Sequence, residues 1–225
     1  MRKIALIALV STLFLSCSKN SNNGSPTGPG TPTTFINNSA GSTWSYHETN
    51  SSTGTPVESD YTVTSTNSDT TIQGKAFHVY SYSFGGFQYL NQSSTDYYQY
   101  DSIPGISSSF VRLFLKTNLD PGQTWDQNIN VTVPNTSTTI PVVLANKIAD
   151  KNSRTVNGIN YQNVIHVQTT ILAAPLPAGA LQSAIDTYYA QGVGLIESSI
   201  VISINYLTIV ENVNIHTTLA SANLK

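Results

Sequence analysis

Residues 125–133 have the sequence WDQNINVTV, in which apolar and polar side chains alternate. The apolar positions are Trp125, Ile129, Val131 and Val133, and the polar positions are Asp126, Asn128, Asn130 and Thr132. Successive side chains of a β-strand point to opposite faces of its sheet, so a period of two predicts a strand with one buried face. This segment therefore indicates a sheet that packs on one side and meets solvent on the other.

The same period of two recurs along the rest of the chain, at 161–171 and 206–219. Shorter segments rich in β-branched and aromatic residues lie at 60–66, 76–84, 96–101, 110–116 and 140–148. Turn-forming residues separate these segments. Asn157-Gly158 is the strongest hairpin signal, because both residues tolerate the positive φ of a type I′ turn. Gly192 and Gly194 predict a bulge or a place where another backbone packs closely.

A helix is predicted only at Ala180–Tyr188, and Pro177 and Gly179 limit it to about two turns. Many short strands without alternating helices predict an all-β fold with at most this one short helix. We expect an antiparallel meander that forms an open or closed barrel-like sheet or a two-layer sandwich. One such β-rich domain is expected to cover residues 35–225.

The first 16 residues have the pattern of a lipoprotein signal peptide. Arg2 and Lys3 precede the short apolar run Ile4–Leu15, whose helical length of about 18 Å cannot span a hydrocarbon core of roughly 30 Å. Phe14-Leu15-Ser16-Cys17 then resembles a lipobox, in which the peptidase cleaves before a lipidated cysteine. Cys17 is the one cysteine of the chain, so no intrachain disulfide is possible and lipid attachment is its expected role.

Residues 17–34 are expected to form the lipidated cysteine and a flexible tether, because they contain no large apolar residue and are rich in Gly, Pro, Ser, Asn and Thr. The expected location is the bacterial cell envelope. Ser18 follows the cysteine where an Asp would indicate retention in the inner membrane, so the outer membrane is favoured. Exposure to the periplasm and exposure at the cell surface both remain open.

Composition limits the function classes. Charged residues make up 10% of the 225 residues, and the formal net charge is −2. A nucleic-acid partner is therefore not expected, because phosphate neutralisation needs a basic surface. Hydrophobic residues make up 39% of the chain, which excludes wholesale disorder.

No motif predicts catalysis, a metal or a cofactor. His47, His78, His166 and His216 form no metal-ligand spacing, and the last two are expected to be exposed because they fall on the polar side of predicted strands. There is no nucleophile elbow. Carboxylate pairs such as Asp96 and Asp101 could serve a glycosidase, but they border predicted turns, so a hydrolase is the less favoured function.

Aromatic residues are the remaining candidates for ligand binding, and the chain has 12 tyrosines and 7 phenylalanines. Tyr97, Tyr98 and Tyr100 are the candidate ligand-binding residues, since tyrosines on a neutral surface can stack on sugar rings or apolar groups. The favoured function is a non-enzymatic binding or carrier module for an amphipathic or glycan ligand. The alternative is a structural or assembly lipoprotein that contacts another envelope protein. The oligomeric state stays open.

Three segments extend the interpretation: Gly41–Tyr46 (GSTWSY), Leu119–Trp125 (LDPGQTW) and Tyr188–Ile196 (YYAQGVGLI). Together they resemble uncharacterised cell-envelope lipoproteins of the Bacteroidetes type, with Gln191 at a position that is frequently Lys. The resemblance implies a β-rich envelope domain and transfers no catalytic residue.

Overall fold

A computed structural model describes residues 34–101, 109–132, 139–174, 176–206 and 209–225. Twelve strands and no helix are found in these residues. The first six strands are β1 (Thr43–Asn50), β2 (Val57–Ile72), β3 (Lys75–Tyr82), β4 (Phe87–Ser93), β5 (Asp96–Asp101) and β6 (Phe110–Lys116). The other six are β7 (Thr124–Thr132), β8 (Thr139–Val156), β9 (Ile159–Leu172), β10 (Leu181–Ala190), β11 (Gly194–Tyr206) and β12 (Ile209–Asn223).

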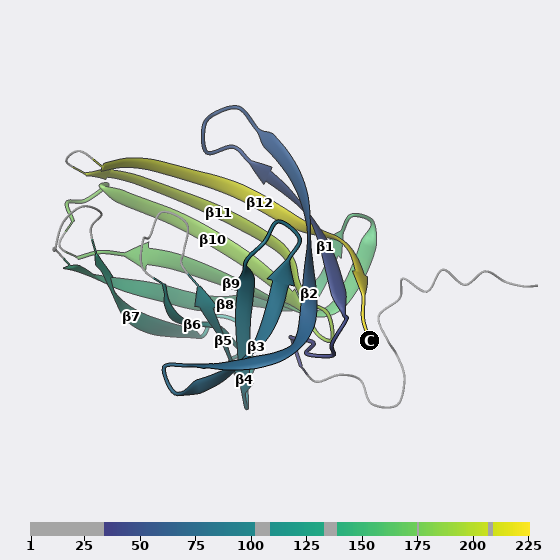
Figure 1. The fold of residues 1–225 in the computed structure, drawn as a ribbon. Coiled ribbons are helices and arrows are strands. Elements are labelled where there is room, and N and C mark those ends of the chain that lie inside the picture. Colours follow the sequence, from purple (N-terminus) through teal and green to yellow (C-terminus); the bar gives the residue numbers. More distant parts are fainter. Residues whose placement is uncertain (1–33, 102–108, 133–138, 175, 207–208) are drawn as a thin grey trace, which may run out of the picture.

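The strands form one sheet in the order β6-β5-β4-β3-β2-β1-β12-β11-β10-β9-β8-β7. Neighbouring strands of this sheet are antiparallel, and each pairs with the next one along the chain except β6 with β7. The pairing of β1 with β12 joins the two halves of the meander. Figure 1 shows the sheet curled around a central space, which leaves β6 and β7 as facing edges. The all-β prediction is confirmed, and the architecture is a nearly closed barrel rather than a two-layer sandwich.

The alternation that predicted β7 is confirmed. Trp125 is buried at 9% exposure, whereas Asp126, Asn128 and Asn130 are exposed. The indole Nε1 of Trp125 donates a hydrogen bond to the Leu113 carbonyl oxygen of β6 at 3.2 Å. This side chain therefore helps to close the gap between the two sheet edges.

The second alternating segment, 206–219, is divided differently from the prediction. Tyr206 is the last residue of β11, and Ile209 is the first residue of β12. These two residues are cross-strand partners. The alternation continues along β12, where Thr217 and Leu219 are buried and Thr218 is less so.

The predicted helix at Ala180–Tyr188 is wrong, because Leu181–Ala190 forms β10. Ile185, Thr187 and Tyr189 are buried at alternate positions, and the strand is paired on both sides, with β9 and β11. Two backbone ladders outweigh the weak local helix preference of this segment.

Both glycine predictions near turns are confirmed. Asn157 and Gly158 have φ angles of 49° and 80° and connect β8 to β9, as a type I′ hairpin requires. Gly194 has a φ of 106°, and a Cβ there would lie 3.5 Å from the carbonyl oxygen of Phe35. The backbone that approaches this glycine is the N-terminal segment, which begins the candidate site.

Candidate ligand-binding site

The segment before β1 closes one end of the barrel. Gly192 donates its amide to the Thr34 carbonyl oxygen at 2.8 Å, and the Phe35 amide donates to the Tyr97 hydroxyl at 3.2 Å. Phe35 and Ile36 are buried at 7% and 6% exposure. Burial of these two side chains among the barrel strands makes the segment a floor for the interior.

Above this floor the barrel contains a cavity of about 550 Å³. Small-molecule sites commonly have volumes of roughly 300–1,000 Å³ and are mostly apolar with a few polar groups. Ser59 and Phe84 at the cavity boundary are exposed, whereas Phe35, Trp44 and Val193 are buried. The cavity therefore has a deep end at the N-terminal segment and an end that meets solvent.

One wall is aromatic and is built by β1, β2 and the β3–β4 hairpin. It consists of Trp44, Tyr46, Tyr61, Tyr80, Tyr82 and Phe84. The rings of Tyr82 and Phe84 stack with centroids 4.9 Å apart, and Tyr61 stacks on Tyr46 at 5.4 Å. The wall runs from Phe84, which is 71% exposed, to Trp44, which is 4% exposed. It offers a continuous apolar surface from solvent to the floor.

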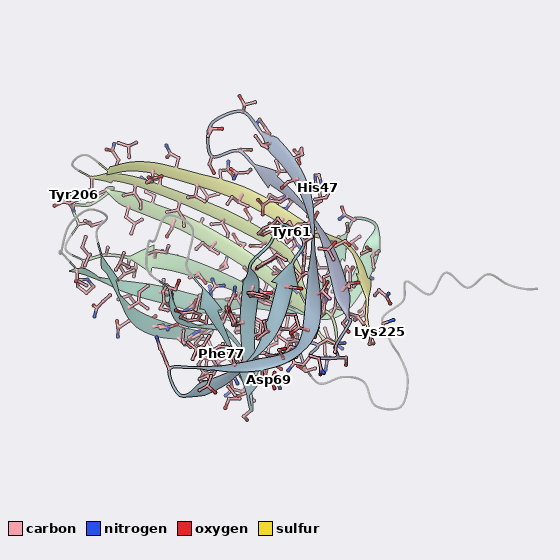
Figure 2. All side chains as sticks on the ribbon, viewed as in Figure 1. His47, Tyr61, Asp69, Phe77, Tyr206 and Lys225 are labelled. Atoms are coloured by element: carbon pink, nitrogen blue, oxygen red, sulfur yellow. The ribbon has the colours of Figure 1, made fainter. Side chains whose placement is uncertain are left out.

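The phenol groups of this wall are neutral. Burial raises the pKa of Tyr61 to about 12, and the charge of Glu48 adds to the rise. Burial also raises the pKa of Tyr80 and of Tyr46. Figure 2 shows Tyr61 on the β1–β2 part of the sheet, together with His47. Tyr61 and Asp60 line the cavity, whereas His47, which forms ion pairs with Glu58 and Asp60, does not.

The next wall is formed by β10, β11 and β12, and it adjoins the aromatic wall where β12 pairs with β1. It carries two rows of side chains in direct register. Thr187, Ser198 and Thr217 are cross-strand partners and form a hydroxyl row. Ile185, Ile200 and Ile215 are also cross-strand partners and form an isoleucine row beside it. Because side chains of one face repeat every second residue, this wall changes from polar to apolar within one layer.

The third side of the cavity carries a cation. Arg112 on β6 lines the cavity beside Gln99 of β5, its cross-strand partner. Its Nη2 donates to Gln99 Oε1 at 2.9 Å, and its buried Nε has no partner among the described residues. Burial raises the pKa of the adjacent Tyr189, and the positive charge of Arg112 partly offsets the rise.

Sequence reasoning missed Arg112 and Gln99. One pattern could have indicated Arg112. It lies between Phe110 and Phe114 at every second position of a predicted strand, so it places a charged side chain on an apolar face, which is unusual without a functional role. The pairing with Gln99 depends on the register of β5 and β6, which includes a bulge opposite Tyr97 and Tyr98. Composition does not specify that register.

The three predicted ligand-binding tyrosines do not share one surface. Tyr97 is 1% exposed and packs edge-on against Phe35 and Phe114 in the core. Tyr98 and Tyr100 lie on the other face of β5, because they alternate with Tyr97 and Gln99. Tyr98 is covered by Lys75 Nζ at 3.9 Å from its ring centroid, and Tyr100 contacts Tyr89. A ligand role for Tyr98 and Tyr100 stays a prediction.

Ser65, His78 and Asp69 form a hydrogen-bonded chain with the order of a hydrolase triad. His78 Nε2 lies 2.9 Å from Ser65 Oγ, and its Nδ1 lies 2.7 Å from Asp69 Oδ1. The burial is the reverse of what nucleophilic attack needs, because Ser65 is 1% exposed and the Asp69 side chain is 74% exposed. The Ser65 amide donates to the Ser42 carbonyl oxygen, so it is not free to hold an oxyanion.

This chain of hydrogen bonds instead holds the end of the β2–β3 hairpin. Figure 2 shows Asp69 and Phe77 where β2 curls away from the barrel wall. The pairing of β2 with β3 is interrupted between Ser65 and Asp69, where the strand bends. His78 bridges the two sides of that interruption, which is a structural role.

The prediction that His166 is exposed is wrong. It is 8% exposed, and its ring stacks on Tyr188 of β10 with centroids 4.2 Å apart. Its Nδ1 and Nε2 lie 3.1 Å and 2.7 Å from carboxylate oxygens of Asp150 and Asp186. A neighbouring strand therefore covers a position that alternation alone places in solvent.

The same outer network continues to β11 and β12. The Arg154 guanidinium lies 3.5 Å from the Tyr188 ring centroid and donates to Glu197 Oε2 at 2.6 Å. His216 Nε2 lies 3.1 Å from Glu197 Oε1, and the His216 side chain is 47% exposed, as predicted. The Arg154 hydrogen bond holds the pKa of Glu197 below its usual value.

The described part of the chain contains neither a metal-ligand cluster nor a membrane-spanning helix. It contains no cluster of three or more His, Cys, Asp or Glu side chains suited to a metal ion. It also contains no apolar helix of membrane-spanning length. Cys17, the predicted lipid-attachment residue, lies outside the described residues.

Comparison with known proteins shows the fold and no family. No family model matches the chain, and no curated protein matches it significantly. The chain is similar to a crystal structure from Parabacteroides distasonis, provisionally described as a lipoprotein, with a TM-score of 0.51 and 12% sequence identity. The similarity covers 85% of this chain and 99% of that chain. At this identity the comparison shows a shared fold.

Proposed function

We propose that this protein is a non-enzymatic binding or carrier module, anchored by lipid in the bacterial cell envelope, that holds an amphipathic small molecule in its barrel. The observation that carries the proposal is the 550 Å³ cavity, with an aromatic wall and, adjoining it, the hydroxyl and isoleucine rows. An amphipathic molecule has the two kinds of surface that these walls match.

The anchor is supported by the sequence and by the neighbouring structure. Arg2 and Lys3, the apolar run Ile4–Leu15 and the single Cys17 form the pattern of a lipoprotein signal peptide. The structurally similar protein from Parabacteroides distasonis is itself provisionally described as a lipoprotein. Ser18, in place of an Asp, favours the outer membrane. The tether that follows would hold the barrel away from the lipid surface.

An amphipathic ligand is favoured over a glycan. A glycan-binding surface usually exposes aromatic rings with free polar neighbours, whereas Tyr98 and Tyr100 already contact Lys75 and Tyr89. The exposed ring of Phe84 instead continues into a buried apolar wall. An apolar ring at an opening is suited to an apolar chain that enters or leaves.

The alternative function is assembly with another envelope protein through a sheet edge or the Ser/Thr-rich face, and the sheet-edge route has less support. An edge strand recruits a partner when its backbone groups are unpaired. Here the edges β6 and β7 face each other, and Trp125 donates to the backbone of Leu113 across them. The side chain of Trp125 therefore links the two edges to each other.

Native mass spectrometry tests the proposal. The full chain with Cys17→Ser is purified without detergent, and its mass is compared under native and denaturing conditions. We expect an additional mass of a few hundred daltons that denaturation or organic extraction removes. A native chain that carries nothing and takes up nothing from a mixture of single-chain amphiphiles would overturn the proposal.

Two adjacent positions on β11 provide a matched pair of variants. Ile200 lines the cavity, whereas Val201 is 44% exposed on the outer face. Ile200→Trp fills part of the cavity and should abolish the additional mass. Val201→Trp adds the same side chain outside the barrel and should retain it.

A further inference from the structure

The cavity encloses a cation that the described residues do not neutralise. Of the described cavity-lining residues, Arg112 alone is positively charged, and no carboxylate among the described side chains lies within ion-pair distance of it. The other arginine in the described ranges, Arg154, is paired with Glu197 on the outer face. A partly buried guanidinium without a counter-ion is costly unless something else satisfies its charge.

The hydrogen bonds of Arg112 are incomplete in a way that points to an acceptor in the cavity. A guanidinium has five N–H donors in a rigid fork that matches two oxygens of a carboxylate. One donor binds Gln99 Oε1, and the buried Nε has no partner in the described part of the chain. Nε is buried away from the cavity, so a ligand oxyanion would bind the terminal N–H groups of the guanidinium, of which only one Nη2 hydrogen bond, to Gln99, is present among the described residues.

The surroundings of Arg112 define where the rest of such a ligand lies. Phe114, on the same face of β6, and Tyr189 pack with the floor segment below. Across the cavity, the hydroxyl row can hydrogen-bond a polar head, and the isoleucine row beside it can contact an apolar chain. The chain then runs along the aromatic wall toward Phe84 at the opening.

Glu48 restricts the position of a negative charge. It lines the cavity on β1, and its charge raises the pKa of Tyr61, which places it beside the aromatic wall. A ligand anion on that wall would be repelled, whereas an anion at Arg112 would be attracted. Asp60 of β2 also lines the cavity, so both carboxylates lie on the β1–β2 side and Arg112 lies on β6. These charges therefore orient an anionic amphiphile with its head toward β6.

We propose that the cavity selects amphiphiles with a carboxylate head, such as a long-chain fatty acid, and that Arg112 binds the carboxylate. This inference rests on the proposed carrier function and names its ligand class. Gln99 holds the guanidinium in place, and the isoleucine row and aromatic wall bind the acyl chain.

The test compares ligands that differ only in the head group. Oleate, oleyl alcohol and oleylamine are titrated into the delipidated full chain with Cys17→Ser, followed by calorimetry and by the fluorescence of Trp44 in the cavity wall. Loss of a charge-assisted hydrogen bond commonly costs a factor of about 10 to 100 in affinity. We expect oleate to bind at least about tenfold more tightly than oleyl alcohol, and oleylamine more weakly still.

Variants assign the selectivity to one side chain. Arg112→Gln should reduce the affinity for oleate to that for oleyl alcohol, and Arg112→Lys should retain part of the preference. Glu48→Gln, which removes the opposing charge in the same cavity, should maintain or increase oleate affinity. Arg154→Gln is the control for loss of an arginine outside the barrel and should have no effect. Thermal unfolding of each variant confirms that it is folded.

The outcomes separate this inference from the proposed function. Equal binding of oleate and oleyl alcohol, or an Arg112→Gln variant that keeps the preference, would overturn the carboxylate site and leave the carrier function standing. Failure of all three amphiphiles to bind would overturn both.

Discussion

Gln127 of β7 donates its side-chain amide to the carbonyl oxygen of Val111 of β6 at 2.6 Å, across the one gap in the barrel. Its Oε1 accepts a hydrogen bond from the Leu113 amide at 2.8 Å. One side chain thus performs the donor and acceptor roles that a paired residue has in a backbone ladder. The barrel is closed by a backbone ladder at β1 and β12, and by side chains at β6 and β7.

Gln127→Ala should weaken this closure. It leaves one backbone donor and one backbone acceptor without partners, and each loss of this kind costs about 1–3 kcal/mol when the group is buried. We expect a decrease of about 2 kcal/mol in the free energy of unfolding, measured by urea denaturation, and faster hydrogen exchange of the Leu113 amide. Asn128→Ala, at the adjacent exposed position, is the control and should change neither. Equal stability of the two variants would show that the side-chain bridge does not hold the edges.

Glu197 should make the stability of the barrel depend on acid pH. Its folded-state pKa is depressed, mainly by the Arg154 hydrogen bond, so its contribution is present above the usual glutamate value of 4.5 and is lost as pH falls through the lower folded value. Glu197→Gln should lower the free energy of unfolding by about 1 kcal/mol at pH 7, since the pair is partly exposed.

The difference between wild type and Glu197→Gln should shrink as the pH is lowered below 4.5, as measured by urea denaturation at a series of pH values. Glu211→Gln removes an exposed carboxylate on β12 and should produce no such convergence. A pH-independent difference for Glu197→Gln would mean that packing, not charge, is responsible.

Much of the fold could be predicted from local pattern. Trp125 and the residues after it alternate because one face of β7 is buried, and Asn157-Gly158 forms the expected hairpin because its backbone needs two positive φ angles. Ala180–Tyr188 could not be assigned correctly, since its strand conformation depends on β9 and β11 on either side. The choice between barrel and sandwich depended on the pairing of β1 with β12, the most distant strands in the sequence.

The candidate site could be predicted less well than the fold. His166 is covered by Tyr188 of another strand, so its own parity did not reveal its burial. Tyr97 and Tyr98 of β5 are adjacent in sequence, so Tyr97 points to the opposite face from Tyr98 and Tyr100. Arg112 is a candidate binding residue only because it lines the cavity that the twelve strands enclose. The sequence around Arg112 does not show that the cavity exists.

Cys17→Ser should abolish lipid attachment. The expected diacylglycerol is attached through the cysteine thiol, and the chain after it contains no polybasic segment that would bind lipid headgroups. We expect the wild-type chain to fractionate with membranes and to carry a lipid mass on its N-terminal peptide. We expect the variant to carry no lipid and to keep residues 1–16, because the peptidase cleaves before a lipidated cysteine. Ser16→Ala, which keeps a small residue before the cysteine, is the control and should remain membrane-bound. A wild-type chain without lipid on Cys17 would exclude the anchor.

Phe84 and Phe87 provide the sharpest test of where a ligand enters. Both side chains are exposed, at 71% and 59%, and they flank the same β3–β4 turn. Only Phe84 lines the cavity, where it stacks on Tyr82 and contacts Tyr61 edge-on. Phe84→Ala should therefore reduce amphiphile affinity by several-fold, because it removes an aromatic surface at the opening worth about 1 kcal/mol. Phe87→Ala should leave affinity unchanged, and neither variant should lose much stability, since neither ring is buried. Equal affinity of the two variants in calorimetric titrations would show that the ligand does not pass or contact this side of the barrel.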